Sequence, residues 1–244
     1  MPGEEFSVEC FSSRGIHKIV GLTRKFKDQI TFVETGHQIP AGLSKTDAER
    51  LAVFVCRCLT ALGVRDGPTH SEVMIHGDDI HLIETHLRMG GDYIPELLAT
   101  SYGVDLPALT AQWIVCGPVE PALLASLPDE AEMHSVIRYL SAEKHGVIEA
   151  FEGVDEALLQ PGVLAVEVFF TPGDQVRPAE QSGDRLAAVR TCAYSAELAH
   201  ERARDALNFL RVSYSGSLHR NQASPSSTSS SDTPSAIEET SRAT

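Results

Sequence analysis

The hydrophobic and polar positions of the chain predict a mixture of strands and helices. Apolar residues alternate with polar ones, or run together between turn residues, in segments that we expect to be strands; these are residues 5–11, 16–22, 30–34, 134–140, 146–151, 163–170 and 185–192. Two more strands joined by a tight turn are predicted within residues 68–91. Apolar spacings of three and four predict helices at 44–63, at 92–101, after Asp105, and at 195–212.

Residues typical of helix ends support these segments. Ser44 is predicted to cap the first helix and Gly63 to end it, and Asp92 and Asp105 are predicted to cap the next two. Ile114, on the helix after Asp105, is expected in the core. Because strands and helices come in mixed runs without regular βαβ alternation, the predicted fold class is α+β with a mostly antiparallel sheet.

The chain is predicted to divide into three parts. Residues 118–128 are rich in Pro and Ala, so we expect a boundary there between a unit at 1–117 and a smaller α+β unit at 118–214. Ser, Thr and Pro then replace apolar residues in the tail 215–244. We expect this tail to be disordered, because it cannot bury enough apolar surface to offset the loss of chain entropy.

The amino-acid composition limits the classes of partner that we expect for the chain. The chain has 244 residues, 42% of them apolar and 22% charged, with a formal net charge of −14 that argues against nucleic acid or an anionic membrane as a partner. No apolar run approaches 18 residues and the N-terminus lacks a signal pattern, so neither a membrane span nor a signal peptide is predicted. The five cysteines are scattered, which favours reduced thiols and a cytoplasmic location.

The two strands within residues 68–91 carry acids at matching positions. A three-residue loop at residues 77–79 would place Glu72 opposite Glu84 and His70 opposite His86, whereas a two-residue loop would turn Glu84 to the other face. Carboxylates on directly opposed residues repel each other unless a cation lies between them. A divalent ion with oxygen ligands, Mg²⁺ above all, is the simplest candidate.

One face of the second strand is predicted to collect Leu82, Glu84, His86 and Arg88, with packed apolar residues such as Ile83 and Leu87 on the other face. The alternative interpretation is a hairpin whose charged side chains face solvent and bind no ligand. Arg88 is followed by Gly90 and Gly91, where backbone can approach an anion closely and lead into a helix. Carboxylates, an arginine and a glycine-rich helix entry together suggest a site for a nucleotide phosphate chain.

Zinc is a second metal candidate, because His70, His76, His81 and His86 lie close in sequence, but their spacing matches no known zinc module and His81 should point to the other face. The basic residues Arg24 and Lys25 are interpreted either as a solvated turn or as a phosphate contact.

Three strings of the sequence resemble ATP-grasp carboxylate–amine ligases, of the kind that includes L-amino acid ligases. Glu72 followed by LIETHLRMGGD (residues 82–92) resembles the metal-binding motif of that family. PGEEFSVE (residues 2–9) and FVETGHQIPA (residues 32–41) resemble its "PGxEFSVE" strand and its "ETGH…PA" segment. The resemblance continues more weakly to about residue 212, so that the units 1–117 and 118–214 would be the family's C-terminal ATP-grasp lobe and its C-terminal subdomain.

This resemblance implies ATP and Mg²⁺, or Mn²⁺ in its place, as cofactors. It implies that Glu72, Glu84 and His86 hold the metal, that His86, Gly90 and Gly91 contact the nucleotide phosphates, and that Glu5 contacts the ribose. Arg88 would clamp the transferring phosphate or the substrate carboxylate, and His37 would hold the substrate carboxyl group.

The implied activity is an ATP-dependent ligase that joins a carboxylate to an amine through an acyl-phosphate, with amino acids as substrates in small-peptide or natural-product biosynthesis. The family also carries an N-terminal lobe with a Gly-rich loop and two lysines, which this sequence lacks. The expectation is therefore a truncated ligase, with a homodimer or a complementing N-terminal half as protein partner. The alternatives are a non-catalytic remnant or subunit module that completes a partner's active site, and an unrelated metal-dependent hydrolase.

Overall fold

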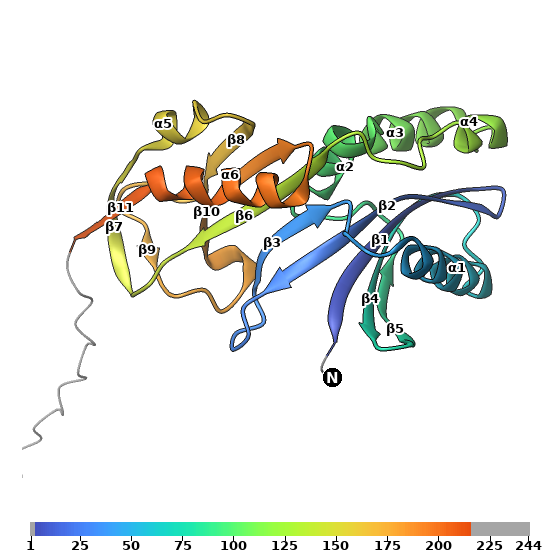
Figure 1. Ribbon diagram of the computed structural model, residues 1–244, viewed down its shortest axis with the longest axis horizontal. Coiled ribbons are helices and arrows are strands. Elements are labelled where there is room, and N and C mark those ends of the chain that lie inside the picture. The colour runs from blue at the N-terminus through green and yellow to red at the C-terminus, as the bar shows by residue number, and fades with distance from the viewer. Residues whose placement is uncertain (1–2, 216–244) are drawn as a thin grey trace, which may run out of the picture.

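The computed structural model describes residues 3–215, which form a long twisted sheet with helices on both faces (Figure 1). The eight strands of this sheet lie in the order β5-β4-β1-β2-β3-β6-β10-β8. All neighbouring strands pair antiparallel, so the predicted α+β class with a mostly antiparallel sheet is confirmed. The strands are β1 (Glu4–Ser13), β2 (Ile16–Lys27), β3 (Glu34–Ile39), β4 (Gly67–His76), β5 (Asp79–His86), β6 (His134–Ser141), β8 (Val163–Val168) and β10 (Arg185–Ala193).

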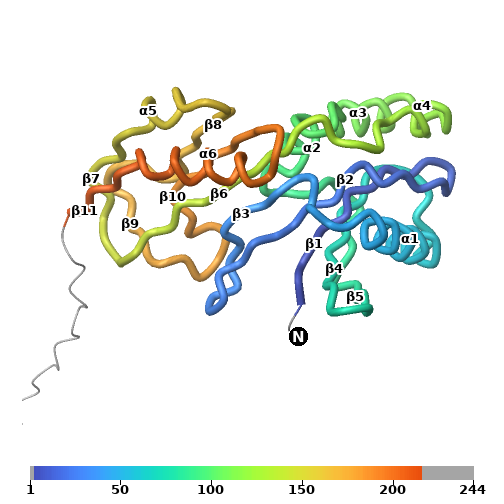
Figure 2. Tube along the Cα trace, in the orientation of Figure 1, coloured from blue at the N-terminus to red at the C-terminus, as the bar shows by residue number. Residues whose placement is uncertain are grey.

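A second, three-stranded sheet lies at the C-terminal end of the molecule. It consists of β11 (Arg211–Ser215), β7 (Gly146–Glu152) and β9 (Gln175–Val176), in that order. The helices are α1 (Lys45–Ala61), α2 (Ile94–Tyr102), α3 (Leu106–Cys116), α4 (Pro121–Ala125), α5 (Val154–Leu158) and α6 (Ala196–Phe209). Figure 2 shows that α6 runs along β6 and β10, whereas α1 lies towards the opposite end of the large sheet, against β2 and β5.

The two faces of the large sheet bury different apolar clusters. On one face, α1 contributes Leu51, Val55 and Leu59, which pack against Phe6 and Val8 of β1. On the other face, α2 and α3 contribute a cluster of Ile94, Leu97, Leu98, Leu106 and Leu109, packed against Phe11, Ile39 and Ile137. The functional residues described below lie on this second face, which we call the α2 face.

Two of the three predicted helix caps are confirmed. The Ser44 hydroxyl accepts the Asp47 backbone N–H at the start of α1, and the Asp105 carboxylate accepts the Ala108 N–H at the start of α3. The predicted Asp92 cap is wrong, because α2 begins at Ile94 after two residues, Asp92 and Tyr93, with left-handed backbone. The Asp92 carboxylate instead accepts hydrogen bonds from His37 and Arg185.

Three further expectations are corrected by the structure. Residues 30–34 are not a strand: the Asp28 carboxylate accepts the backbone N–H groups of Ile30 and Thr31, which forms a turn, and β3 begins only at Glu34. The last helix ends at Phe209, because the next residues pair with β7 as strand β11. Ile114 is not a core residue, since it is 70% exposed on the outer side of α3.

The predicted boundary at 118–128 contains the short helix α4 and does not interrupt the large sheet, because β3 pairs directly with β6 from Gly36↔Arg138 to Ile39↔Ser135. The predicted disordered tail lies, apart from Ser215, outside the described residues. All five cysteines have free thiols. No helix in residues 3–215 is both long enough and apolar enough to cross a membrane.

Candidate active site

The hairpin of β4 and β5 places Glu72 opposite Glu84 and His70 opposite His86. The turn that achieves this differs from the expected one. His76 pairs with Asp79 around a two-residue turn at Gly77 and Asp78, which by itself would send Glu84 to the other face. A β-bulge at Ile83, which has no partner between the pairs Val73↔Leu82 and Glu72↔Glu84, restores the facing acids.

The same bulge corrects the predicted faces of β5. Leu82 packs with the apolar cluster under α1 and not beside Glu84. Ile83 and Leu87, which were expected to be packed, are 48% and 74% exposed. β5 is an edge strand of the sheet, and it therefore leaves both apolar side chains and the half-exposed Glu84 open to solvent.

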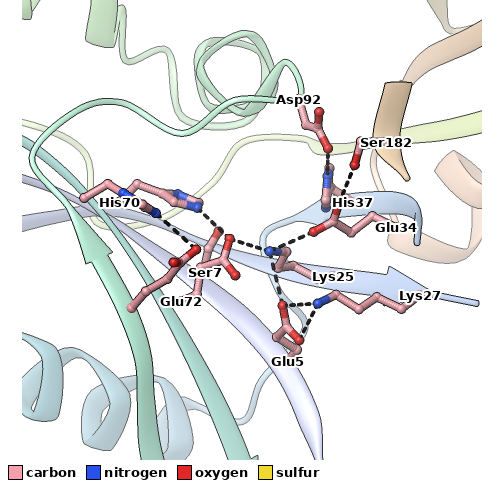
Figure 3. A network of polar contacts seen from close by, with 12 residues as sticks. Glu5, Ser7, Lys25, Lys27, Glu34, His37, His70, Glu72, Asp92 and Ser182 are labelled. Atoms are coloured by element: carbon pink, nitrogen blue, oxygen red, sulfur yellow. Dashed lines mark hydrogen bonds and ion pairs between the residues drawn. The ribbon is translucent and has the colours of Figure 1, made fainter. Parts of the chain in front are cut away.

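Lys25 is the charged centre of the α2 face, and the alternative of a solvated turn is wrong for it. The side chain is 3% exposed, and its Nζ lies 2.6 Å from Glu72, 3.0 Å from Glu34 and 3.2 Å from Glu5 (Figure 3). Burial lowers the pKa of Lys25, but the hydrogen bonds and charges of Glu72 and Glu34 outweigh it and raise that pKa above its ordinary value. One buried ammonium group thus holds three carboxylates from three strands.

His70 extends this network along β4. Its Nδ1 lies 2.6 Å from a Glu9 oxygen and its Nε2 lies 3.2 Å from Glu72, so both ring nitrogens donate to carboxylates. Burial opposes the charged form, yet the bonds with Glu72 and Glu9 raise the pKa of His70 to about 9. The hydrogen bond from His70 in turn lowers the pKa of Glu72. Burial opposes this shift, but the hydrogen bond and charge of Lys25 add to it, and the pKa of Glu72 falls to about 2.

A second group of charges joins the C-terminal part of the chain to the site. Asp92 accepts from His37 Nε2 at 3.1 Å and from Arg185 of β10 at 2.8 Å, and Arg185 also donates to Glu34 at 2.8 Å. Against the effect of burial, the partners His37 and Arg185 lower the pKa of Asp92 to about 2. The Nδ1 atom of His37 is buried and has no hydrogen-bond partner among the described residues, which leaves it for a ligand.

The loop between β5 and α2 lies close above this network. A side-chain carbon at Gly90 would come within 2.9 Å of His70 Nδ1 and 3.2 Å of a Glu9 oxygen, so only glycine allows this approach. At Gly91 the same carbon would meet nothing within 4 Å, which shows open space on its outer side.

A cavity of about 190 Å³ collects several predicted residues. Its lining includes Glu72, Arg88, His37 and Gly91, together with Lys25, His70 and Asp92. Arg88 is exposed, and its guanidinium donates to the Met89 carbonyl oxygen. Glu5 joins through Lys25, whereas Glu84 and His86 contact each other at 3.1 Å outside the lining.

The carboxylate pair fits a magnesium ion better than a zinc ion. In residues 3–215 no group of three or more His, Cys, Asp or Glu side chains converges to hold a metal, which gives no support to a histidine zinc site. Mg²⁺ needs less from the protein, because it is usually bound by one or two carboxylates, with phosphates and water as the other ligands. Glu72 and Glu84 face each other across the hairpin. The metal-ligand roles of Glu72, Glu84 and His86 stay predictions.

Three members of the network escaped the sequence analysis. Glu9, Glu34 and Arg185 had no assigned role, because each acts through partners that are distant in sequence. Arg185 lies 93 positions beyond Asp92. Local signals existed for Glu34, which belongs to the "ETGH" string, and for Glu9, the last residue of PGEEFSVE.

Comparison with known proteins agrees with this geometry. Residues 1–96 match the family model of the ATP-grasp domain, and residues 138–215 match that of the L-amino acid ligase C-terminal domain 2. Two separate parts of the chain therefore resemble an ATP-grasp domain and the C-terminal domain of L-amino acid ligases. The resemblance seen in the sequence is thereby confirmed.

Among solved structures, the L-amino acid ligase from Bacillus licheniformis superposes with a TM-score of 0.79 at 22% identity, over 88% of this chain and 55% of that one. Human carnosine synthase 1 is 36% identical over 92 residues, which cover 38% of this chain and 11% of the relative. The protein y4rH of Sinorhizobium fredii is 30% identical over 145 residues, 59% of this chain and 28% of the relative. This chain thus spans less than a third of the curated relatives and about half of the structural neighbour.

Proposed function

We propose that this chain takes part in the ATP- and Mg²⁺-dependent ligation of a carboxylate to an amine, through an acyl-phosphate, with amino acids as substrates. The observation that carries the proposal is the facing pair Glu72 and Glu84 beside a cavity lined by Arg88, His37 and Gly91. The kinship with L-amino acid ligases and carnosine synthases supports the same reaction class.

The residues divide the work by their chemistry. Glu72 and Glu84, with His86, would hold Mg²⁺, which when bound supplies positive charge to the phosphate oxygens of ATP. His86, Gly90 and Gly91 would contact the nucleotide phosphates, and Glu5, fixed by Lys25 and Lys27, would accept from the ribose hydroxyls.

The reacting carboxylate would lie between Arg88 and His37. The Arg88 guanidinium clamps the substrate carboxylate or the transferring phosphoryl group, because its forked donors match two oxygens at once. A His37 ring protonated on both nitrogens would donate through Nδ1 to the substrate carboxylate, while Asp92 accepts from Nε2 and orients the ring. The carboxylate then attacks the γ-phosphorus of ATP, and ADP leaves.

The exposure of the site favours a second candidate, a subunit module. Glu84 is half exposed, and Arg88 contacts only a neighbouring backbone oxygen among its described hydrogen bonds. In this candidate the chain supplies the metal-binding side of a site that another segment or chain completes, either a second copy or an N-terminal ligase half. The cytoplasmic location also remains a prediction, supported by five free thiols.

Acyl-phosphate trapping tests the proposal. The full chain is incubated with ATP, Mg²⁺, mixed amino acids and hydroxylamine, and ADP and hydroxamate are measured. We expect both products, with rates at least 100-fold lower in Glu84→Gln and unchanged in Glu49→Gln, a matched change on the exposed side of α1. If products form only after addition of the part of the Bacillus licheniformis ligase outside the matched region, the module is favoured. Absence of both products under both conditions would contradict the ligase function.

A further inference from the structure

A second, larger cavity of about 680 Å³ meets the small one at Gly91 and Asp92, which line both. Its wall is mainly aromatic and apolar, with Met89, Tyr93, Pro95, Tyr139 and Phe169 among its members. This volume lies within the range of about 300–1,000 Å³ that is typical of small-molecule sites. A ligand here would lie next to a group bound between Arg88 and His37.

The segment that separates the two cavities is strained and held firmly. Asp92 and Tyr93 have φ angles of 53° and 61°, a left-handed conformation that side chains disfavour. His37 and Arg185 bind the Asp92 carboxylate, the Tyr139 hydroxyl donates to the Asp92 carbonyl oxygen at 3.3 Å, and Arg190 lies 4.9 Å from the centre of the Tyr93 ring. The surroundings thus fix this strained wall in one place.

The charges of the larger cavity fit an amine. Arg185, which is 3% exposed, is already bonded to Asp92 and Glu34, so its positive charge is largely neutralised. Glu96 at the rim is exposed and forms no ion pair within residues 3–215. An ammonium group can therefore approach past Glu96, while an apolar substituent covers the aromatic wall.

Phe169 is a partly exposed aromatic residue of this wall. It lies just after β8, 42% of its surface is exposed, and it lines the cavity from the C-terminal part of the chain. Large apolar side chains left open at a concave surface are typical of ligand sites.

We propose that the larger cavity binds the amine substrate, that this substrate is a primary amine with an aromatic or bulky apolar group, and that Phe169 selects it. This inference rests on the proposed ligase function. The ammonium group first loses a proton to water; the lone pair of the resulting neutral amine attacks the acyl carbon, the new C–N bond forms, and the C–O bond to phosphate breaks with its electrons on the phosphate oxygen. The surplus amine proton goes to the departing phosphate.

Direct binding tests the cavity without catalysis. L-Phenylalaninamide and glycinamide are titrated into the full chain, and saturation-transfer NMR and calorimetry are recorded. We expect phenylalaninamide to bind at least tenfold more tightly than glycinamide, and Phe169→Ala to remove this preference. Tyr194→Ala, which shortens an aromatic side chain that is 84% exposed, should leave the preference unchanged. Phe169→Leu, with a smaller loss of apolar surface, should keep part of it.

Three results would overturn the inference: equal binding of the two amides, no detectable binding of phenylalaninamide at about 1 mM, which corresponds to about −4 kcal/mol, or equal effects of Phe169→Ala and Tyr194→Ala. The trapping assay separates this failure from failure of the ligase function, because hydroxylamine is too small to need the aromatic wall. Hydroxamate formation that is the same in wild type and Phe169→Ala, with amide formation from phenylalaninamide lost only in the variant, supports both proposals.

Discussion

His70 and His200 lie on opposite faces of the large sheet and hold their protons very differently. His70, on the α2 face, donates to Glu9 and Glu72, and its pKa is raised to about 9. His200, on α6, has Gln38 and Arg138 as hydrogen-bond partners, and burial followed by the Arg138 charge lowers its pKa to about 4.

The difference shows how the chain distributes charge across one sheet. The α2 face gathers carboxylates and balances them with Lys25, His70 and Arg185, whereas the α6 face keeps a neutral histidine beside an arginine. Within residues 3–215, the α2 face thus combines several acids with buried cations, whereas His200 on the other face has no carboxylate partner. Substitutions of these residues should therefore change the free energy of unfolding by different amounts.

Loss of the ammonium group at Lys25 should have the largest effect. Lys25→Met leaves Glu5, Glu34 and Glu72 close together with no buried amine between them, and we expect a loss of about 3–5 kcal/mol in the free energy of unfolding. Urea denaturation at pH 7 measures it. Lys25→Arg should lose less, and Lys45→Met, an exposed matched change, should have no effect. Added Mg²⁺ should restore part of the loss; a Lys25→Met variant as stable as wild type would remove the central role of Lys25.

The two facing acids should differ in stability when no metal is present. Glu72→Gln removes a charge bound by Lys25 and His70, which should cost about 1–3 kcal/mol. Glu84→Gln changes a half-exposed side chain and should stay within about 0.5 kcal/mol of wild type. Urea denaturation with EDTA present compares them. Equal losses of unfolding free energy in both variants would contradict the predicted difference between Glu72 on β4 and Glu84 on β5.

The third prediction concerns the pH dependence of stability at His200. Because its pKa is lower in the folded state than the ordinary 6.5, its neutral form is favoured on folding. The stability that this gives is present above pH 6.5 and is lost as the pH falls towards 4. Allowing for partial exposure, we expect a loss of about 1–2 kcal/mol over that range. His200→Gln should flatten this part of the profile in pH-dependent denaturation; an unchanged profile would contradict a neutral His200.

The sequence predicted what depends on neighbouring residues and missed what depends on distant ones. The caps at Ser44 and Asp105 were found because each capping side chain accepts a backbone N–H only three residues further along the chain. The Glu72–Glu84 pair was predicted with the wrong turn, because the bulge at Ile83 leaves no local sequence signal. Arg185 was missed because its partners Asp92 and Glu34 lie on distant parts of the chain; the pairing of β3 with β6 and of β6 with β10 brings Arg185 to Glu34, and the loop before α2 adds Asp92.

The most direct test of the central claim is a Mn²⁺ titration of the full chain followed by electron paramagnetic resonance. The account predicts one site whose affinity falls by at least about tenfold in both Glu72→Gln and Glu84→Gln, since even residues that only support metal ligands change affinity by about 10–100-fold. Glu49→Gln should bind as wild type does. Equal Mn²⁺ affinity in all four proteins would contradict a metal site between Glu72 and Glu84.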